Sequence, residues 1–175
     1  MKTNKPINIF IVEDNKVFSM AVKAEIKEAF EDLPLMLHDF ETGEACMKKI
    51  KEVKPWVVIM DYHLNSKYPN AADGIEVLDM IKKENKNTNV IMLTSEDNID
   101  IALKSFKHGA SDYIVKSETT YRKINYSLFN LLKIMEAKKE ALKYKYFTGI
   151  FIGLMGLLIG SIIVIQVFAP SIFNK

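Results

Sequence analysis

The segment Trp56-Val57-Val58-Ile59-Met60-Asp61 runs five large apolar residues directly into one aspartate. A short run this rich in β-branched residues predicts a strand that is buried on both faces of a parallel sheet. Asp61 is therefore expected at the carboxyl end of a strand, which is the edge where open α/β sheets place their ligands. An isolated aspartate there often does no more than begin a turn, so its role depends on which residues stand at the ends of the other strands.

The chain around this segment alternates between strand and helix patterns. Strands are predicted over 7–12, 35–40, 56–61, 89–93 and 113–115. Helices are predicted over 15–30, 42–53, 71–85, 97–107 and from 117 onward, with Asp97 and Ser117 as N-caps of the last two. Strands that alternate with helices predict an α/β fold, a doubly wound five-stranded parallel sheet with right-handed crossovers.

Polar residues follow four of these strands. They are Glu13, Asp14, Asp61, Thr94 and Lys116, and a parallel sheet brings all of them to one edge. Three carboxylates that converge repel one another, and Mg²⁺ with its oxygen ligands removes that repulsion. A carboxylate beside Mg²⁺, a lysine and a hydroxyl is suited to receiving a phosphoryl group, because the cations and the hydroxyl neutralise its oxygens.

On these residues, the chain resembles the receiver domains of two-component response regulators over about residues 5–130, which have a flavodoxin-like fold. The resemblance implies that Glu13 and Asp14 hold Mg²⁺ with Asp61 and the backbone carbonyl of His63. It implies that Asp61 is the phospho-acceptor, that Lys116 binds the phosphoryl group, and that Thr94 and Tyr113 form the switch. It further implies a histidine kinase or phosphotransfer protein as donor, and self-phosphorylation with slow self-dephosphorylation rather than enzymatic turnover.

Two departures from the family's pattern stand out. Asp61 and Gly74, which opens the turn into the third helix, lie thirteen residues apart instead of the usual eight, and Ser66 takes a position usually held by proline. The longer loop, with its proline at Pro69, is expected to affect partner choice or to cover the site. The family's Lys-Pro pair, with its cis bond, is here Lys116-Ser117. A cis bond without proline costs about 3–4 kcal/mol, so a trans bond and a different reach of the lysine are expected.

The net charge of +2 conceals an uneven distribution. Residues 1–120 carry −4, residues 121–145 carry +5, and residues 146–174 carry no charge. The uncharged stretch 147–169 would form about 35 Å of helix, against about 30 Å of bilayer hydrocarbon. We therefore predict a receiver domain (1–130), a basic juxtamembrane helix (131–145), one transmembrane helix (146–170) and a short tail (171–175).

The basic residues precede the apolar stretch, so the positive-inside rule places the receiver domain in the cytoplasm and the C-terminus outside. The segment is expected to contact membrane lipid. A basic patch confined to the membrane boundary argues against nucleic-acid binding. A single cysteine, Cys46, excludes an internal disulfide, and three scattered histidines make a zinc site improbable.

Small residues recur on one face of the apolar helix. They are Gly149, Gly153, Gly156 and Gly160, at spacings suited to close helix pairing. An apolar heptad pattern runs from Tyr121 through Leu142 into Gly149 and Gly156, and Lys138 and Lys145 interrupt its apolar seam. This continuity predicts a homodimer whose last helix is paired through the membrane, although glycine is also simply common in membrane helices.

Two other classes of function are compatible with parts of the sequence. One is a membrane scaffold with a receiver fold whose Asp61 is never phosphorylated, and the intact set of polar strand ends argues against it. The other is a flavodoxin-like redox protein, which is disfavoured because no Gly- or Ser/Thr-rich phosphate-binding loop follows the first strand.

Overall fold

The computed structural model describes residues 6–64 and 72–168. The chain separates into two units, Met1–Phe129 and Asn130–Lys175. The first unit contains a five-stranded parallel sheet in the order β2-β1-β3-β4-β5. The strands are β1 (Ile7–Val12), β2 (Leu35–Phe40), β3 (Val57–Asp61), β4 (Asn89–Thr94) and β5 (Asp112–Val115). This arrangement confirms the predicted sheet.

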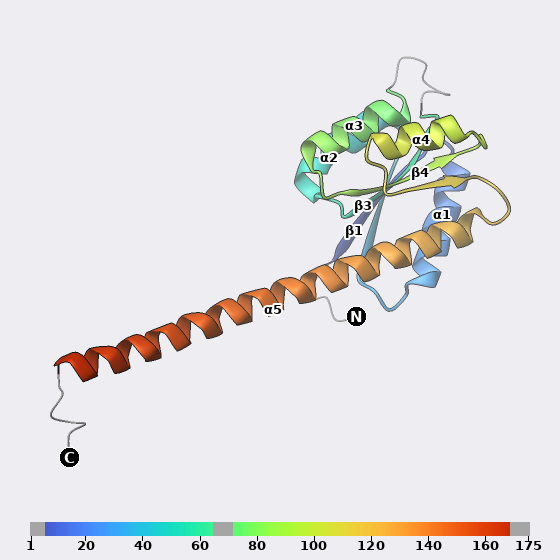
Figure 1. The fold of residues 1–175 in the computed structure, drawn as a ribbon. Helices are drawn as coiled ribbons and strands as arrows, with labels where there is room; N and C mark the ends of the chain where they lie inside the picture. The colour runs from blue at the N-terminus through green and yellow to red at the C-terminus, as the bar shows by residue number, and fades with distance from the viewer. Residues whose placement is uncertain (1–5, 65–71, 169–175) are drawn as a thin grey trace. The chain divides into compact units, whose positions relative to one another are not determined.

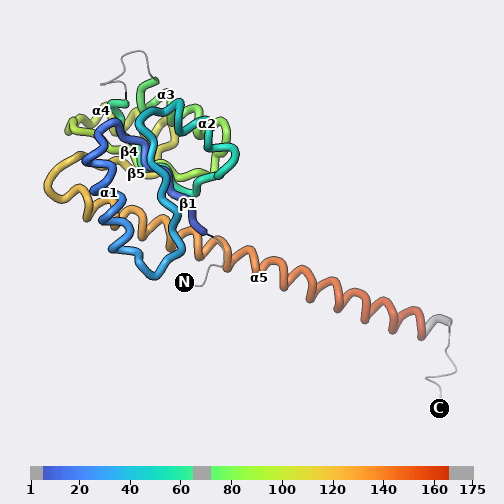
Figure 2. Tube along the Cα trace, turned by 180° about the vertical axis from the view of Figure 1, so that it is seen from behind, coloured from blue at the N-terminus to red at the C-terminus, as the bar shows by residue number. Residues whose placement is uncertain are grey.

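Helices cover both faces of the sheet. They are α1 (Lys16–Ala29), α2 (Gly43–Val53), α3 (Gly74–Glu84), α4 (Ile99–Lys107) and α5 (Thr120–Phe168). Helices α2, α3 and α4 lie on one side of the sheet, and α1 and the first turns of α5 lie on the other (Figures 1 and 2). The doubly wound arrangement leaves the carboxyl ends of the strands uncovered by helices.

The central strands are buried because they are apolar on both faces. All five residues of β3 are buried, including its terminal aspartate. Alternate side chains such as Phe10, Val58 and Met92 pack into the core under α2 and α3. Their neighbours Ile9, Ile59 and Ile91 are fully buried too, and the alternation of strand side chains directs them to the opposite face. The core thus fixes the direction in which each strand end leaves the sheet.

Three predicted helix starts are wrong by one to three residues. Helix α3 begins at Gly74 rather than near 71, because Asp73 and Glu76 form a capping box. Asn98, not Asp97, caps α4, since its side chain accepts a hydrogen bond from the Asp100 backbone. Helix α5 begins at Thr120 rather than directly after Ser117. Runs of several capping residues make such boundaries ambiguous in a sequence.

Helix α5 is unusual in length and composition. It is a single helix of 49 residues, and by length and composition it contains a stretch apolar enough to cross a membrane. Its apolar side chains in the second unit are exposed, for example Phe151, Leu157 and Ile163. The long apolar C-terminal helix of the prediction is therefore present, whereas residues 169–175, including the predicted tail, lie outside the described part of the chain.

Candidate functional site

The carboxyl ends of four strands are aligned by the sheet register. Asp61 pairs with Leu93 of β4, and Thr94 pairs with Val115 of β5. The hydrogen bonds continue one residue past the strands: the Glu13 amide donates to Phe40 O at 2.9 Å and the Lys116 amide to Thr94 O at 2.6 Å. The backbone therefore places the polar residues after each strand at one edge of the sheet, as the sequence predicted.

Three carboxylates converge at this edge. Glu13, Asp14 and Asp61 each offer one oxygen, and these oxygens lie within 4.8 Å of one another. Glu13 and Asp61 are buried, and Asp14 is partly buried. A hard cation with oxygen ligands fits this donor set, because Mg²⁺ is bound in proteins through a few carboxylates and water molecules. The buried like charges would otherwise be costly.

Lys116 joins two of these carboxylates. Its Nζ donates to Glu13 Oε2 and to Asp61 Oδ2, each at 2.8 Å. Burial and the nearby Asp61 charge raise the pKa of Glu13 above its usual value despite the lysine. Burial alone would lower the pKa of Lys116, but its hydrogen bonds to Asp61 and Glu13 outweigh burial and raise it. Lys116 therefore carries its positive charge within reach of both oxygens.

The turn after β5 differs from the family's Lys-Pro turn. No cis peptide bond occurs in the described ranges, so Lys116-Ser117 is trans. The Ser117 amide donates to Thr120 Oγ1 at 2.6 Å, and that hydroxyl donates to Ser117 O at 2.7 Å. Thr120 is buried and closes the turn with its hydroxyl. Lys116 thus reaches Asp61 without the family's Lys-Pro turn.

The other predicted residues lie around the same edge. Thr94 is fully buried, and its Oγ1 accepts a hydrogen bond from the Glu96 amide at 3.1 Å. The Tyr113 hydroxyl donates to Glu96 O at 3.0 Å, and burial raises its pKa. The His63 amide donates to Asp61 Oδ1 at 3.3 Å, and its imidazole Nε2 lies 2.9 Å from Glu96 Oε1. The role of the His63 carbonyl as a metal ligand stays a prediction.

Gly74 allows α3 to begin beside the site. Its amide donates to Tyr62 O at 2.9 Å. A Cβ at this position would lie 2.7 Å from Tyr62 Cα and 2.8 Å from Asp61 O. Only glycine permits this approach of two backbones. The longer loop between Asp61 and Gly74 therefore returns to a normal helix start, while Ser66 and Pro69 lie outside the described residues.

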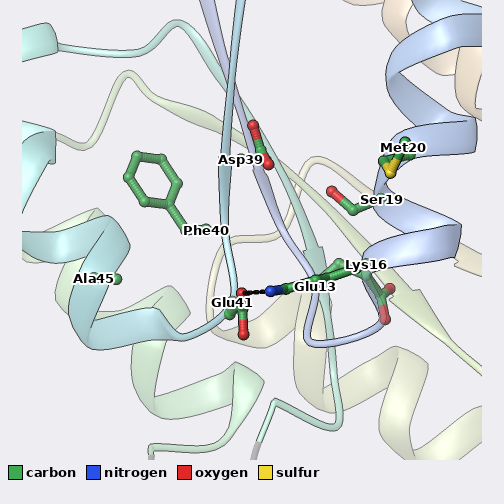
Figure 3. A pocket seen from close by; sticks show the side chains of 8 residues that line it. All are labelled: Glu13, Lys16, Ser19, Met20, Asp39, Phe40, Glu41 and Ala45. Atoms are coloured by element: carbon green, nitrogen blue, oxygen red, sulfur yellow. Dashed lines mark ion pairs between the residues drawn. The ribbon is translucent and has the colours of Figure 1, made fainter.

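A cleft of about 560 Å³ lies on the β2 side of the site (Figure 3). Its lining residues come from the end of β1, from α1, β2 and α2, and are Glu13, Lys16, Ser19, Met20, Asp39, Phe40, Glu41 and Ala45. Lys16 Nζ lies 2.9 Å from Glu41 Oε1 across it, and Lys23 pairs with Asp39. Asp39 and Glu41 in this cleft are therefore each paired with one lysine, whereas in the strand-end cluster Lys116 is shared by Glu13 and Asp61.

Two aromatic residues beside the lysine were not predicted. Lys116 Nζ lies 4.6 Å from the centre of the Phe18 ring, and this ring stacks on Tyr121 at 5.8 Å. In the sequence, Phe18 is one residue of the helix predicted over 15–30, and Tyr121 is one position of a heptad pattern. No local pattern relates positions that are so far apart in the chain.

The family model of the response regulator receiver domain matches residues 9–125, more than half of the chain. The chain therefore belongs to the response regulator receiver domain family. It is 27% identical over 138 residues to the chemotaxis protein CheY of Listeria monocytogenes, covering 78% of this chain and 99% of that protein. It resembles the signal receiver domain of a LuxO repressor protein from Vibrio parahaemolyticus with a TM-score of 0.64, 24% identity and coverage of 77% and 96% of the two chains.

Other relatives are longer proteins. The chain is 29% identical over 118 residues to a protein-glutamate methylesterase/protein-glutamine glutaminase of Nitrobacter winogradskyi. That match covers 66% of this chain but only 26% of the relative. The shared part is therefore the receiver domain, and the remainder of that protein has no counterpart in the match.

Proposed function

We propose that the protein accepts a phosphoryl group on Asp61 from the phosphohistidine of a histidine kinase or a phosphotransfer protein. The observation that carries this proposal is the contact of 2.8 Å between Lys116 Nζ and Asp61 Oδ2 within the cluster of Glu13, Asp14 and Asp61. In this arrangement the Asp61 carboxylate is the nucleophile, and Glu13 and Asp14 are available to a metal ion. Receiver domains act in two-component signalling, which supports the donor class.

The chain's own residues account for most of the transfer. An Asp61 carboxylate oxygen forms the bond to phosphorus, the bond from phosphorus to the donor imidazole breaks, and that imidazole takes up a proton. Lys116 moves from the free carboxylate to a phosphoryl oxygen, and the Thr94 hydroxyl donates to another. Glu13, Asp14, Asp61 and the His63 carbonyl would hold Mg²⁺, which would further neutralise the phosphoryl oxygens. Because the acceptor keeps the group, the protein is a phosphorylated carrier and not a turnover enzyme.

Incubation of the full chain with acetyl phosphate and Mg²⁺, followed by intact-mass measurement, tests this proposal. The wild type should gain the mass of one phosphoryl group, and chelation of the metal should prevent the gain. Asp61→Asn should not be labelled, whereas Asp79→Asn on the exposed side of α3 should be labelled normally. If the wild type gains no mass under these conditions, the alternative of a non-phosphorylated scaffold is favoured.

Thr94 and Tyr113 are proposed to report the phosphorylated state. The Tyr113 hydroxyl donates to the carbonyl of Glu96, the same residue whose amide donates to Thr94 Oγ1. When the Thr94 hydroxyl turns to a phosphoryl oxygen, the Glu96 amide loses its acceptor and the tyrosine ring is free to enter the vacated space. Such a paired shift is a change between two discrete packings. Identical rotamers of both residues with and without a phosphoryl mimic would contradict it.

We further propose that residues 146–170 anchor the protein in a membrane, with the receiver domain (1–130) in the cytoplasm and residues 171–175 outside. The support is the apolar part of α5, its length, and the lysines that precede it. Asn174→Cys in intact cells should react with a membrane-impermeant maleimide, and Lys86→Cys only after lysis. Cys46 gives no background in the folded protein, because burial raises its pKa to about 12.

The apolar helix is also proposed to pair in a homodimer. A Cβ built on Gly149, Gly153, Gly156 or Gly160 meets nothing within 4 Å, so this face has room for a second helix. Gly153→Leu with Gly160→Leu should lower crosslinking yields in detergent. Inserting two residues near Lys139 should uncouple phosphorylation from pairing. Unchanged yields in both variants would leave the helix as a simple tether.

A further inference from the structure

Lys116 contacts a pair of aromatic rings in addition to its carboxylate partners. Its Nζ lies 4.6 Å from the centre of the Phe18 ring, which belongs to the first turn of α1. The Phe18 ring stacks on Tyr121 at the start of α5, with centroids 5.8 Å apart and an interplanar angle of 28°. The two helices that flank the site on one face of the sheet thus meet at the lysine.

Apart from the Phe18 ring, the partners of the Lys116 side chain among the described residues are two carboxylates. Its backbone amide is fixed by Thr94 O, and the turn that follows is closed by Thr120. The ammonium is bound by Glu13 and Asp61, and Asp61 changes its chemistry when it is phosphorylated. A lysine side chain has four rotatable bonds and loses about 2 kcal/mol of rotamer entropy on being fixed. A partner that does not change during the reaction would keep the ammonium beside position 61 while its oxygen partner changes.

We infer that Phe18, supported by Tyr121, is a positioning residue that holds the Lys116 ammonium beside the phosphoryl-accepting oxygen. The face of an aromatic ring attracts a cation, and the attraction is stronger where water is partly excluded. The Lys116 side chain is 21% exposed, and Phe18 is partly buried. The ring therefore restricts the ammonium without neutralising its charge. This inference rests on the proposed phosphoryl transfer to Asp61.

The ring could instead serve only to pack α1 against α5. The two roles make different demands on the residue at position 18. Packing depends on apolar volume, so leucine would largely preserve it. Attraction of a cation depends on the π-system, which leucine lacks and tryptophan keeps. Tyr126 provides a control, because it is an exposed aromatic residue of α5 whose ring makes no contact with Lys116 among the described residues.

The experiment compares Phe18→Leu, Phe18→Trp and Tyr126→Leu with the wild type, as full chains purified in detergent. It measures the rate constant for labelling by acetyl phosphate with Mg²⁺, the affinity for beryllofluoride as a phosphoryl mimic, and the midpoint of thermal unfolding. Phe18→Leu should lower the rate constant and the affinity about three- to tenfold, the range that a partly exposed cation–π contact supports. Phe18→Trp should keep the rate constant and the affinity near their wild-type values, and Tyr126→Leu should change neither.

A rate and an affinity for Phe18→Leu equal to those of the wild type would overturn the inference. It would also be overturned if Phe18→Trp were as impaired as Phe18→Leu while its unfolding midpoint stayed normal. Labelling of Asp61→Asn is measured in parallel. Persistent labelling of that variant contradicts the proposed function itself, whereas its loss together with an unaffected Phe18→Leu contradicts only the role of the ring.

Discussion

The strand ends of the receiver domain and the apolar part of α5 both depart from the usual rule that apolar side chains are buried and charged ones exposed. At the strand ends, charged groups are buried: Glu13 is 3% exposed and Asp61 is 6% exposed. In α5, apolar groups are exposed, and Leu157 is 72% exposed. Buried charges require partners, and large exposed apolar surfaces require a surrounding medium other than water. The first region fits the proposed metal-dependent phosphoryl transfer, and the second fits the proposed membrane anchor.

Removing the apolar region should have the largest effect on where the protein is found. A chain truncated after residue 145 should move from the membrane fraction to the soluble fraction, because the exposed apolar side chains are lost. Its rate of labelling by acetyl phosphate should equal that of the full chain. A truncated chain that stays with membranes, or a full chain that remains soluble without detergent, would contradict this division of roles.

Removing the cation of the buried site should have the next largest effect. Lys116→Met keeps the apolar stem but leaves the phosphoryl oxygens without the ammonium, so the labelling rate should fall about 10²- to 10³-fold, as for the loss of one oxyanion donor. Lys104→Met on the exposed face of α4 is the matched control and should label normally. Rates within twofold of each other for the two variants would show that the lysine is only structural.

Replacing one glycine in each region should have a smaller effect, which is on the stability of the receiver domain. Gly74→Ala forces a Cβ against the backbone of Tyr62, so it should lower the free energy of unfolding of the receiver domain by about 1–3 kcal/mol. Gly156→Ala meets nothing within 4 Å and should leave that free energy unchanged. Chemical denaturation followed by circular dichroism makes the comparison. Equal stability of the two variants would mean that the approach of α3 to the site is not constrained.

The exposed ion pair between Lys23 and Asp39 should have the smallest effect. The hydrogen bond to Lys23 lowers the pKa of Asp39 below its usual 3.8, so the pair contributes stability above that value. This contribution is lost as the pH falls through the lowered pKa of the folded state. Because Asp39 is half exposed, Lys23→Met should cost less than about 1 kcal/mol at neutral pH. The wild-type and variant stabilities should converge in acid, and a difference that grows in acid would contradict the assignment.

Most of the fold was predictable because strand and helix periodicity are local properties. The run that ends at Asp61 identified the central strand, and the parallel topology then placed Glu13, Thr94 and Lys116 at the same edge. Helix starts were less predictable, since Asp97 and Asn98 are both good capping residues and only the final packing selects one. The boundary between the receiver domain and the later part of α5 leaves no break in the helical pattern.

The contacts that arise only from tertiary packing were not predictable. The stacking of Phe18 on Tyr121 joins residues more than one hundred positions apart, and no sequence motif contains both residues. The turn after Lys116 was predicted only as a departure from the family's pattern. Its replacement by the hydroxyl of Thr120 depends on a side chain that reaches back by three residues, which a sequence pattern does not show.

The position of the phosphoryl group tests the central claim most directly. An acyl phosphate is reduced by borohydride to an alcohol, so the phosphorylated full chain can be treated with borohydride, digested and mapped by mass spectrometry. The structure predicts that position 61 is converted from aspartate to homoserine, only in samples that received both acetyl phosphate and Mg²⁺. Conversion at Asp14 or at another carboxylate, with Asp61 intact, would contradict it.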